Sequence, residues 1–275
     1  MSRIIQITDT HVVAPPALVA ERVDTRLALE SCAARIRAAL DEIGPIDVIV
    51  ATGDLTDRGG AAEFETFQRL IAPTGLPVVA IPGNHDRREP MRAAFAQERF
   101  MPESGPIDWM MDLSDFRLIA LDTLIEGETG GELSARSLDF LRDALDGAGA
   151  RPVLVALHHP PFKTGIRFMD EIGLKNAAAF SAALEGRSAE TRVICGHVHR
   201  YITGMAGGCP AIIGPSTAHA IPADYRPDAP AGFVREPGGF LIHEWAGGFR
   251  STYVGSEPAE GPFRFDDGVA IRRAP

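Results

Sequence analysis

Apolar residues recur in two patterns along the first hundred residues of the chain. Short runs rich in Ile, Val and Ala are typical of strands buried on both faces, and longer stretches with an apolar residue every three or four positions are typical of amphipathic helices. The predicted strands cover residues 3–7, 48–51 and 77–81, and the predicted helices cover residues 24–43, 61–71 and 90–100. Strands and helices therefore take turns, which predicts a parallel sheet with crossover helices.

The pattern changes after residue 102. A hairpin is predicted at residues 109–113 and 116–122, helices at 134–145 and 176–184, strands at 152–157 and 192–195, and a loop or lid at 164–175. Four later runs, set apart by Gly and Pro, predict strands at residues 201–206, 211–213, 239–245 and 249–254. Because no repeat or linker divides the chain, we expect one compact α/β domain with two sheets.

The composition of the chain limits which binding partners and which cellular compartment are expected. The chain of 275 residues has 27 Lys and Arg against 37 Asp and Glu, a net charge of −10, which disfavours nucleic acid and anionic membranes as partners. Its three cysteines lack metal-binding spacing and favour a reducing compartment. The first strand begins at residue 3, and no run reaches membrane-spanning length, so we expect no signal peptide, no membrane segment and a cytoplasmic location.

Metal-ligand side chains follow the predicted strands at their carboxyl ends, where ligands collect in open α/β sheets. They are Asp9, His11, Asp54, Asn84, His85, His158, His197 and His199. Residues i and i+2 of an extended segment point the same way. The pair Asp9 and His11, and the pair His197 and His199, can therefore each converge on one site. Oxygen and imidazole donors suit Zn, Mn or Fe(II), and their number suits two ions that share a carboxylate. Taken singly, a D-x-H or H-x-H pair is more often a surface pair or a support for a ligand, and a G-N-H-D is more often a turn.

Together these motifs resemble the calcineurin-like metallophosphoesterase superfamily, whose signature elements are D-x-H, G-D, G-N-H-D, a lone H and G-H-x-H. They stand here as Asp9-Thr10-His11, Gly53-Asp54, Gly83-Asn84-His85-Asp86, His158 and Gly196-His197-Val198-His199, within residues 3–200. The resemblance implies a four-layer α/β/β/α sandwich of two mixed sheets flanked by helices. It also implies two divalent ions (Mn, Fe, Zn or Co), one held by Asp9, His11, Asp54 and His199, the other by Asp54, Asn84, His158 and His197.

Residues 158–161, 168–170 and 216–219 resemble the branch that contains bacterial glycerophosphodiesterases and class III cyclic-nucleotide phosphodiesterases. That branch implies hydrolysis of small phosphodiesters by a metal-bound hydroxide, with cyclic nucleotides and glycerophosphodiesters both open as substrates. A phosphomonoesterase or protein phosphatase, a nuclease and a non-catalytic scaffold are the alternatives. Residues 1–200 would form the catalytic core, and residues 201–275 would complete the second sheet and act as a cap or dimer contact. The aromatic segment 261–265 favours association of two copies.

The remaining candidate residues surround this centre. We expect His85 and the shared ligand Asp54 to be catalytic, with Asp86 orienting His85 or its loop. Asn84, His85, His159 and His219 are expected to face the substrate; a supporting role for His159 and a solvated loop position for His219 stay open. His243 and Cys195 lie in apolar strands and are expected to be structural, and Arg58 is expected to be structural or to lie outside the ligands.

Overall fold

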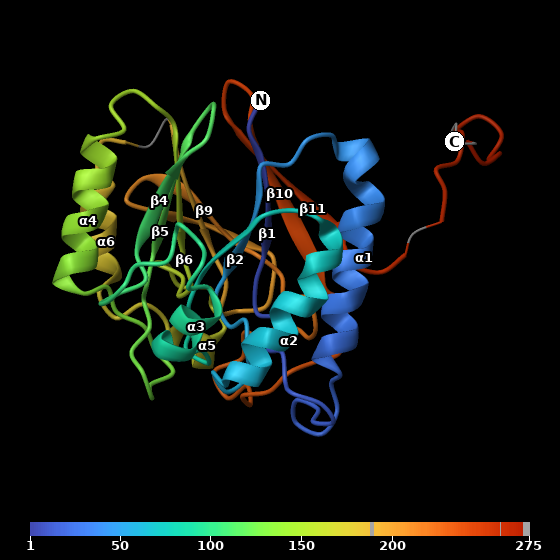
Figure 1. Cartoon of the computed structure of the whole chain (residues 1–275), viewed down its shortest axis with the longest axis horizontal. Coiled ribbons are helices and arrows are strands. Elements are labelled where there is room, and N and C mark those ends of the chain that lie inside the picture. The colour runs from blue at the N-terminus through green and yellow to red at the C-terminus, as the bar shows by residue number, and fades with distance from the viewer. Residues whose placement is uncertain (188–189, 259, 272–275) are drawn as a thin grey trace.

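Two β-sheets packed face to face, with helices on both outer sides, make up the body of the protein (Figure 1). The computed structural model describes residues 1–187, 190–258 and 260–271. Helices α1 (Thr25–Ile43) and α2 (Ala61–Ile71) lie outside the first sheet, and α4 (Ala135–Asp146) and α6 (Ala177–Ala183) lie outside the second. The predicted fold class, two mixed sheets flanked by helices, is confirmed.

The first sheet has the strand order β11-β10-β1-β2-β3. Its strands are β1 (Arg3–Ile7), β2 (Val48–Thr52), β3 (Val78–Ile81), β10 (Gly239–Trp245) and β11 (Phe249–Gly255). The first three are parallel, as the alternation of strands and helices predicts, and β10 runs antiparallel to β1.

The second sheet has the order β4-β5-β6-β7-β9-β8. Its strands are β4 (Trp109–Asp112), β5 (Arg117–Leu121), β6 (Val153–Leu157), β7 (Thr191–Cys195), β8 (Ile202–Ala206) and β9 (Cys209–Ile213). The four inner strands are parallel, and the antiparallel strands β4 and β8 form the edges.

One prediction about the C-terminal part is wrong. Strands β8 and β9 complete the second sheet, but β10 and β11 join the first. The free side of β1 explains this placement: β10 pairs with it from Arg3 to Gln6 and covers a buried edge that would otherwise leave main-chain groups unpaired. An ion pair between Arg3 and Glu244, 2.6 Å from Nη2 to Oε2, fixes the register.

Alternate residues of the central strands face different cores. Along β6, Leu154 and Ala156 pack in the core shared by the two sheets, α1 and α2, whereas Val153, Val155 and Leu157 pack in the core beneath α4 and α6. Because successive strand residues point to opposite faces, a strand between two layers must be apolar throughout. This is why β6 is the most apolar strand of the sequence.

Most predicted helices form where the sequence places them. The Asp24 carboxylate accepts hydrogen bonds from the main-chain N–H groups of Arg26 and Leu27 and caps α1, and the Ser134 hydroxyl caps α4. The helix expected at 90–100 is wrong in its bounds, because α3 spans Arg88–Ala94. Its first N–H donates to Glu126 Oε1, 3.0 Å away, which starts the helix two residues early.

The segment expected as a loop or lid contains a short helix, α5 (Arg167–Glu171). The Asp170 carboxylate accepts hydrogen bonds from the main chain of Thr164 and Gly165 and closes the turn that precedes it. Met169 is buried in the core under the second sheet. Packing in this core therefore accounts for the position of Met169.

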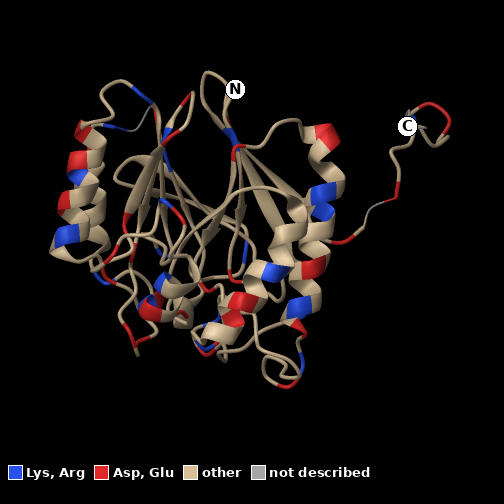
Figure 2. Ribbon diagram, viewed as in Figure 1, with Lys and Arg blue, Asp and Glu red and all other residues tan. Residues whose placement is uncertain are grey.

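The last described residues leave the body beyond α1 and turn back on themselves (Figure 1). Phe263 is half exposed and Phe265 is fully exposed there. Acidic and basic residues are interspersed along the outer helices, while the strands between them carry few charged residues (Figure 2). Among the described residues, no helix has the length and apolar character needed to cross a bilayer.

Candidate metal centre

The predicted ligands come together at the carboxyl ends of strands from both sheets. Each follows its strand within a few residues: Asp9 and His11 follow β1, Asp54 follows β2, Asn84 follows β3, His158 follows β6, and His197 and His199 follow β7. Five of them, Asp9, His11, Asp54, His197 and His199, adopt left-handed φ angles between 42° and 72°. Such strained backbone in non-glycine residues is typical of functional sites.

Glycine permits the close approach of these loops. Gly53 has φ +97°, and a Cβ atom there would lie 2.3 Å from Nδ1 of His158. A Cβ atom on Gly196 would lie 2.0 Å from the Thr8 hydroxyl oxygen. The main chain itself joins the first two loops, since the N–H of His11 donates to the Asp54 carbonyl at 2.9 Å.

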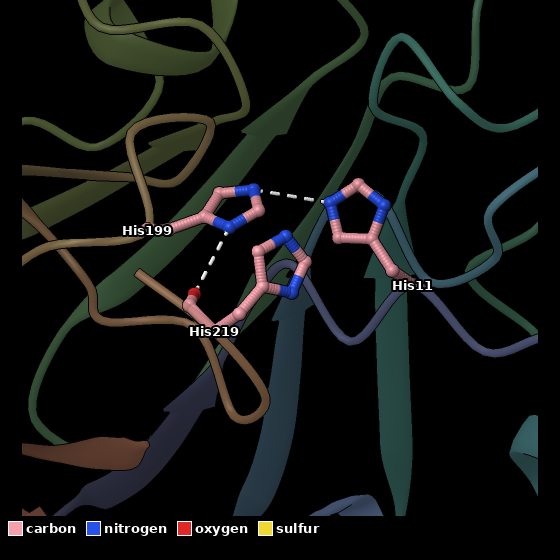
Figure 3. Close-up of side chains that lie close together, drawn as sticks. All are labelled: His11, His199 and His219. Carbon is pink, nitrogen blue, oxygen red and sulfur yellow. Dashed lines mark hydrogen bonds between the residues drawn. The ribbon is translucent and has the colours of Figure 1, made fainter. Parts of the chain in front are cut away.

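The first ligand cluster consists of Asp9, His11, Asp54 and His199, and one ligand atom from each lies within 4.8 Å of all the others. Nε2 of His11 lies 3.0 Å from Nε2 of His199 (Figure 3). His199 Nε2 lies 3.4 Å from Asp9 Oδ1, and His11 Nε2 lies 3.5 Å from Asp54 Oδ2. All four side chains are buried.

The second cluster shares Asp54 with the first. Asp54 Oδ2, the oxygen that faces His11, lies 3.3 Å from Nε2 of His158. Asn84 Oδ1 lies 3.3 Å from the same His158 nitrogen and 3.0 Å from Nδ1 of His197. One carboxylate oxygen thus stands between two groups of nitrogen and oxygen donors, as a bridging ligand would.

The donor set fits divalent cations. Among the described residues, no Lys or Arg pairs with the buried carboxylates of Asp9 and Asp54, whose partners are histidines. Nε2 of His11 and Nε2 of His199 face one another, although two neutral imidazoles can share only one proton in such a pair. A cation between these atoms would satisfy both lone pairs and both carboxylates.

Burial and charge set the protonation of these groups. Burial raises the pKa of Asp9 to about 6. Burial opposes the charge on His158, but the neighbouring Asp54 carboxylate outweighs it and raises the His158 pKa to about 9. Burial, then the charge of His158, lowers the pKa of His197 to about 3, and burial also holds the pKa of His199 well below its usual value. His197 and His199 therefore present neutral imidazoles, the form that binds metals.

Hydrogen bonds behind two of the predicted ligands orient them. His158 donates its Nδ1–H to the Thr52 carbonyl at 2.8 Å, and His199 donates its Nδ1–H to the His219 carbonyl at 3.1 Å. Each bond leaves Nε2 as the nitrogen that faces the centre. This arrangement is usual for histidine ligands, whose second nitrogen is held by a neighbouring acceptor.

His85 lies at the edge of the first cluster, with its side chain 39% exposed. Its ring meets the His11 ring edge-on at 4.5 Å, and its Nδ1–H donates to the Asp57 carbonyl at 2.9 Å. Asp86 accepts hydrogen bonds from the main chain of Leu55, Thr56 and Gly83, so it ties the His85 loop to the loop after β2. The structure therefore brings Asp86 to the place where the sequence expects it, holding the loop.

Asp57 is a site residue that the sequence reasoning missed. Its carbonyl holds His85, and its carboxylate Oδ1 lies 3.4 Å from Nδ1 of His11. The available signal is its position three residues after Asp54, in the same loop. Arg58 is exposed, with Nε 3.7 Å from Asp57 Oδ2, and so lies outside the ligands.

The chain matches known proteins in both sequence and structure. A family model of the calcineurin-like phosphoesterases matches residues 2–201. The chain belongs to this family. The predicted resemblance is thereby confirmed.

Two relatives of this phosphoesterase are named as phosphodiesterases. The chain is 31% identical to the Arcobacter nitrofigilis protein named "Probable glycerophosphodiester phosphodiesterase GpdQ", over 95% of this chain and 96% of that protein. It is 34% identical to the 3′,5′-cyclic adenosine monophosphate phosphodiesterase CpdA of Pseudomonas aeruginosa, over 78% of this chain and 75% of that one.

Solved structures share the fold. A dimetal phosphatase from Danio rerio superposes with a TM-score of 0.61 at 14% identity, covering 93% of this chain and 99% of that one. GAP50, the anchor in the inner membrane complex of Plasmodium, gives a TM-score of 0.62 at 13% identity, covering 98% and 87%. At such identities the likeness concerns architecture alone.

The remaining histidines have distinct surroundings. His159 is fully buried, with Nδ1 2.8 Å from the Thr123 hydroxyl and Nε2 3.2 Å from the Thr129 carbonyl. His219 lies beside the first cluster. His243 is buried between Ser251 and Gln6, which accounts for it as a structural residue, and Cys195 is buried too.

Proposed function

We propose that this phosphoesterase is a dinuclear metal-dependent phosphodiesterase that hydrolyses small phosphodiesters, either cyclic nucleotides or glycerophosphodiesters. The observation that best supports this proposal is the position of Asp54 Oδ2 between His11 and His158, which gives the two ligand clusters one shared carboxylate. The relatives support the reaction class, since both are named for hydrolysis of a phosphodiester.

Two bound divalent ions would supply positive charge for the phosphate and acidify a water molecule for attack on phosphorus. Asp9, His11, Asp54 and His199 would hold one, and Asp54, Asn84, His158 and His197 the other. With only two carboxylates in these sets, the loaded centre keeps positive charge. An anionic diester could therefore be attracted by a protein whose net charge is −10.

His85 is proposed to stabilise the transition state or to protonate the leaving alkoxide. Because its Nδ1–H is held by the Asp57 carbonyl, Nε2 is the nitrogen left to meet a substrate. The side chain is partly exposed and lies against His11, so a phosphate at the centre would come within its reach. Reach to the reacting group is the first requirement for a general acid.

Two other residues expected to face the substrate, Asn84 and His159, differ in their surroundings. Asn84 is partly exposed and remains a proposed contact in addition to its role as a ligand. We propose that His159 supports the ligands instead of meeting the substrate, because the protein occupies both of its ring nitrogens. This favours the second of the two roles that the sequence left open for His159.

The proposed setting is cytoplasmic, with a small phosphodiester as the partner and without nucleic acid. Three free, buried cysteines support a reducing compartment, and the negative net charge opposes polyanions. Exposed Phe263 and Phe265 support association of two copies.

A substrate panel tests the proposal. Purified protein with Mn, Co, Fe or Zn would be assayed on cAMP, 2′,3′-cyclic nucleotides, glycerophosphocholine and glycerophosphoethanolamine, and on bis- and mono-(p-nitrophenyl) phosphate. We expect turnover of diesters, with bis-(p-nitrophenyl) phosphate cleaved faster than the monoester. Preference for the monoester would favour a phosphatase, and a metal-replete protein without any turnover would favour a scaffold.

A further inference from the structure

His219 is placed at the first ligand cluster by the segment that follows β9. The Ser216 hydroxyl donates to the Asp9 carbonyl at 2.7 Å and accepts from the N–H of Ala218 at 3.0 Å. The segment is thus tied to the loop that carries Asp9 and His11. His219 is only 7% exposed, which excludes the solvated loop position left open by the sequence.

The main chain and the side chain of His219 both face the cluster (Figure 3). Its carbonyl accepts the Nδ1–H of His199, and its ring lies 4.6 Å from the His199 ring and 5.4 Å from the His11 ring, between centroids. One ring nitrogen from each of the three histidines lies within 4.8 Å of the other two. Three imidazoles are therefore grouped at the first ligand cluster.

The ring of His219 lacks a protein partner at one nitrogen. Nδ1 is buried and makes no hydrogen bond to any described residue. Phe233 packs edge-on against the ring at 5.3 Å and closes its other side with an apolar surface. Figure 3 shows Nδ1 on the side of the ring turned away from His11 and His199, so Nε2 is the nitrogen that faces the cluster.

We propose that His219 is a further ligand of the first metal position, adding a third imidazole to those of His11 and His199. Asp9, His11, Asp54 and His199 alone would leave open positions on an ion that accepts five or six ligands. A third imidazole would favour ions that bind nitrogen well, such as Fe, Co or Zn, over Mg or Ca. The inference rests on the metal centre of the proposed function and is independent of its substrate.

Cobalt binding to the metal-free protein tests this role without any assay of turnover. Co(II) would be titrated into the wild type, His219→Ala and His219→Asn, with affinity and visible absorption as readouts. His85→Ala is the matched control, because it removes a neighbouring histidine that lies outside both ligand sets. Urea unfolding of the metal-free proteins would show that each variant is folded.

We expect two binding events in the wild type and in His85→Ala. In both His219 variants, one event should weaken by ~10-fold or more, with a changed absorption spectrum, while the other stays as it was. Wild-type affinity and spectrum in folded His219→Ala and His219→Asn would overturn the proposal and return His219 to the substrate. Failure of the wild type to bind two equivalents of Co(II) would instead refute the dinuclear centre itself.

Discussion

His85 donates its Nδ1–H to the main-chain carbonyl of Asp57, 2.9 Å away. The bond joins the loop after β3 to the loop after β2, whose Asp54 side chain belongs to both ligand clusters. The bond fixes the ring beside His11 and leaves Nε2 as the nitrogen that it does not occupy. A residue at the edge of the centre is thereby held in one orientation.

Replacing His85 should separate catalysis from metal binding. We expect His85→Ala to retain wild-type metal content while its turnover falls by ~10²–10⁴-fold, because the transition state loses a positioned proton donor. The loss should be greater for alkyl leaving groups than for p-nitrophenolate, which needs no protonation. Metal analysis alongside kinetics checks this, and an unchanged kcat would refute the role.

The glycine before Asp54 should be needed for both the fold and the centre. Gly53→Ala places a Cβ atom 2.3 Å from His158 Nδ1 at a φ of +97°, so we expect a loss of more than ~1 kcal/mol in the free energy of unfolding, together with weaker metal binding. Gly75→Ala is the matched control, since Gly75 also has a positive φ but has open space around it. Equal effects of the two variants on metal binding would contradict the close-approach explanation.

The buried side chain of His243 should make the protein less stable as the pH is lowered. Burial, then the charge of Arg192, lowers the His243 pKa from 6.5 to about 3, so this histidine stays neutral in the folded protein while the unfolded chain takes up a proton. The contribution of His243 to the free energy of unfolding is therefore lost as the pH falls from 6.5 toward 3. Between about pH 7.5 and about pH 5.5 the contribution of this residue is ~1.4 kcal/mol.

The variant His243→Gln isolates that contribution. Urea unfolding of the metal-free wild type and variant at both pH values should show a smaller loss on acidification in the variant, by ~1.4 kcal/mol. At about pH 7.5 the variant is expected to be less stable, because Ser251 and Gln6 lose their partner. Identical pH dependence in the two proteins would contradict the role of His243.

The sequence predicts where the candidate ligands gather, because each follows a strand that must be apolar. Val48–Thr52 is buried on both faces, so the polar Asp54 just beyond it stands out, and the parallel order of β1 to β3 brings such ends together. The placement of β10 and β11 could not be predicted, since an apolar pattern does not determine which strand lies beside another. Asp57 was missed for a related reason: it holds His85 through its main-chain carbonyl, which every residue has.

The central claim is that two divalent ions share the carboxylate of Asp54, and anomalous diffraction from crystals grown with Mn²⁺ tests it most directly. We predict two peaks ~3.5–4 Å apart on either side of Asp54, one among Asp9, His11 and His199 and the other among Asn84, His158 and His197. In crystals of Asp54→Asn, both peaks should weaken. A single peak in the wild type, or two peaks that do not share Asp54, would contradict the account.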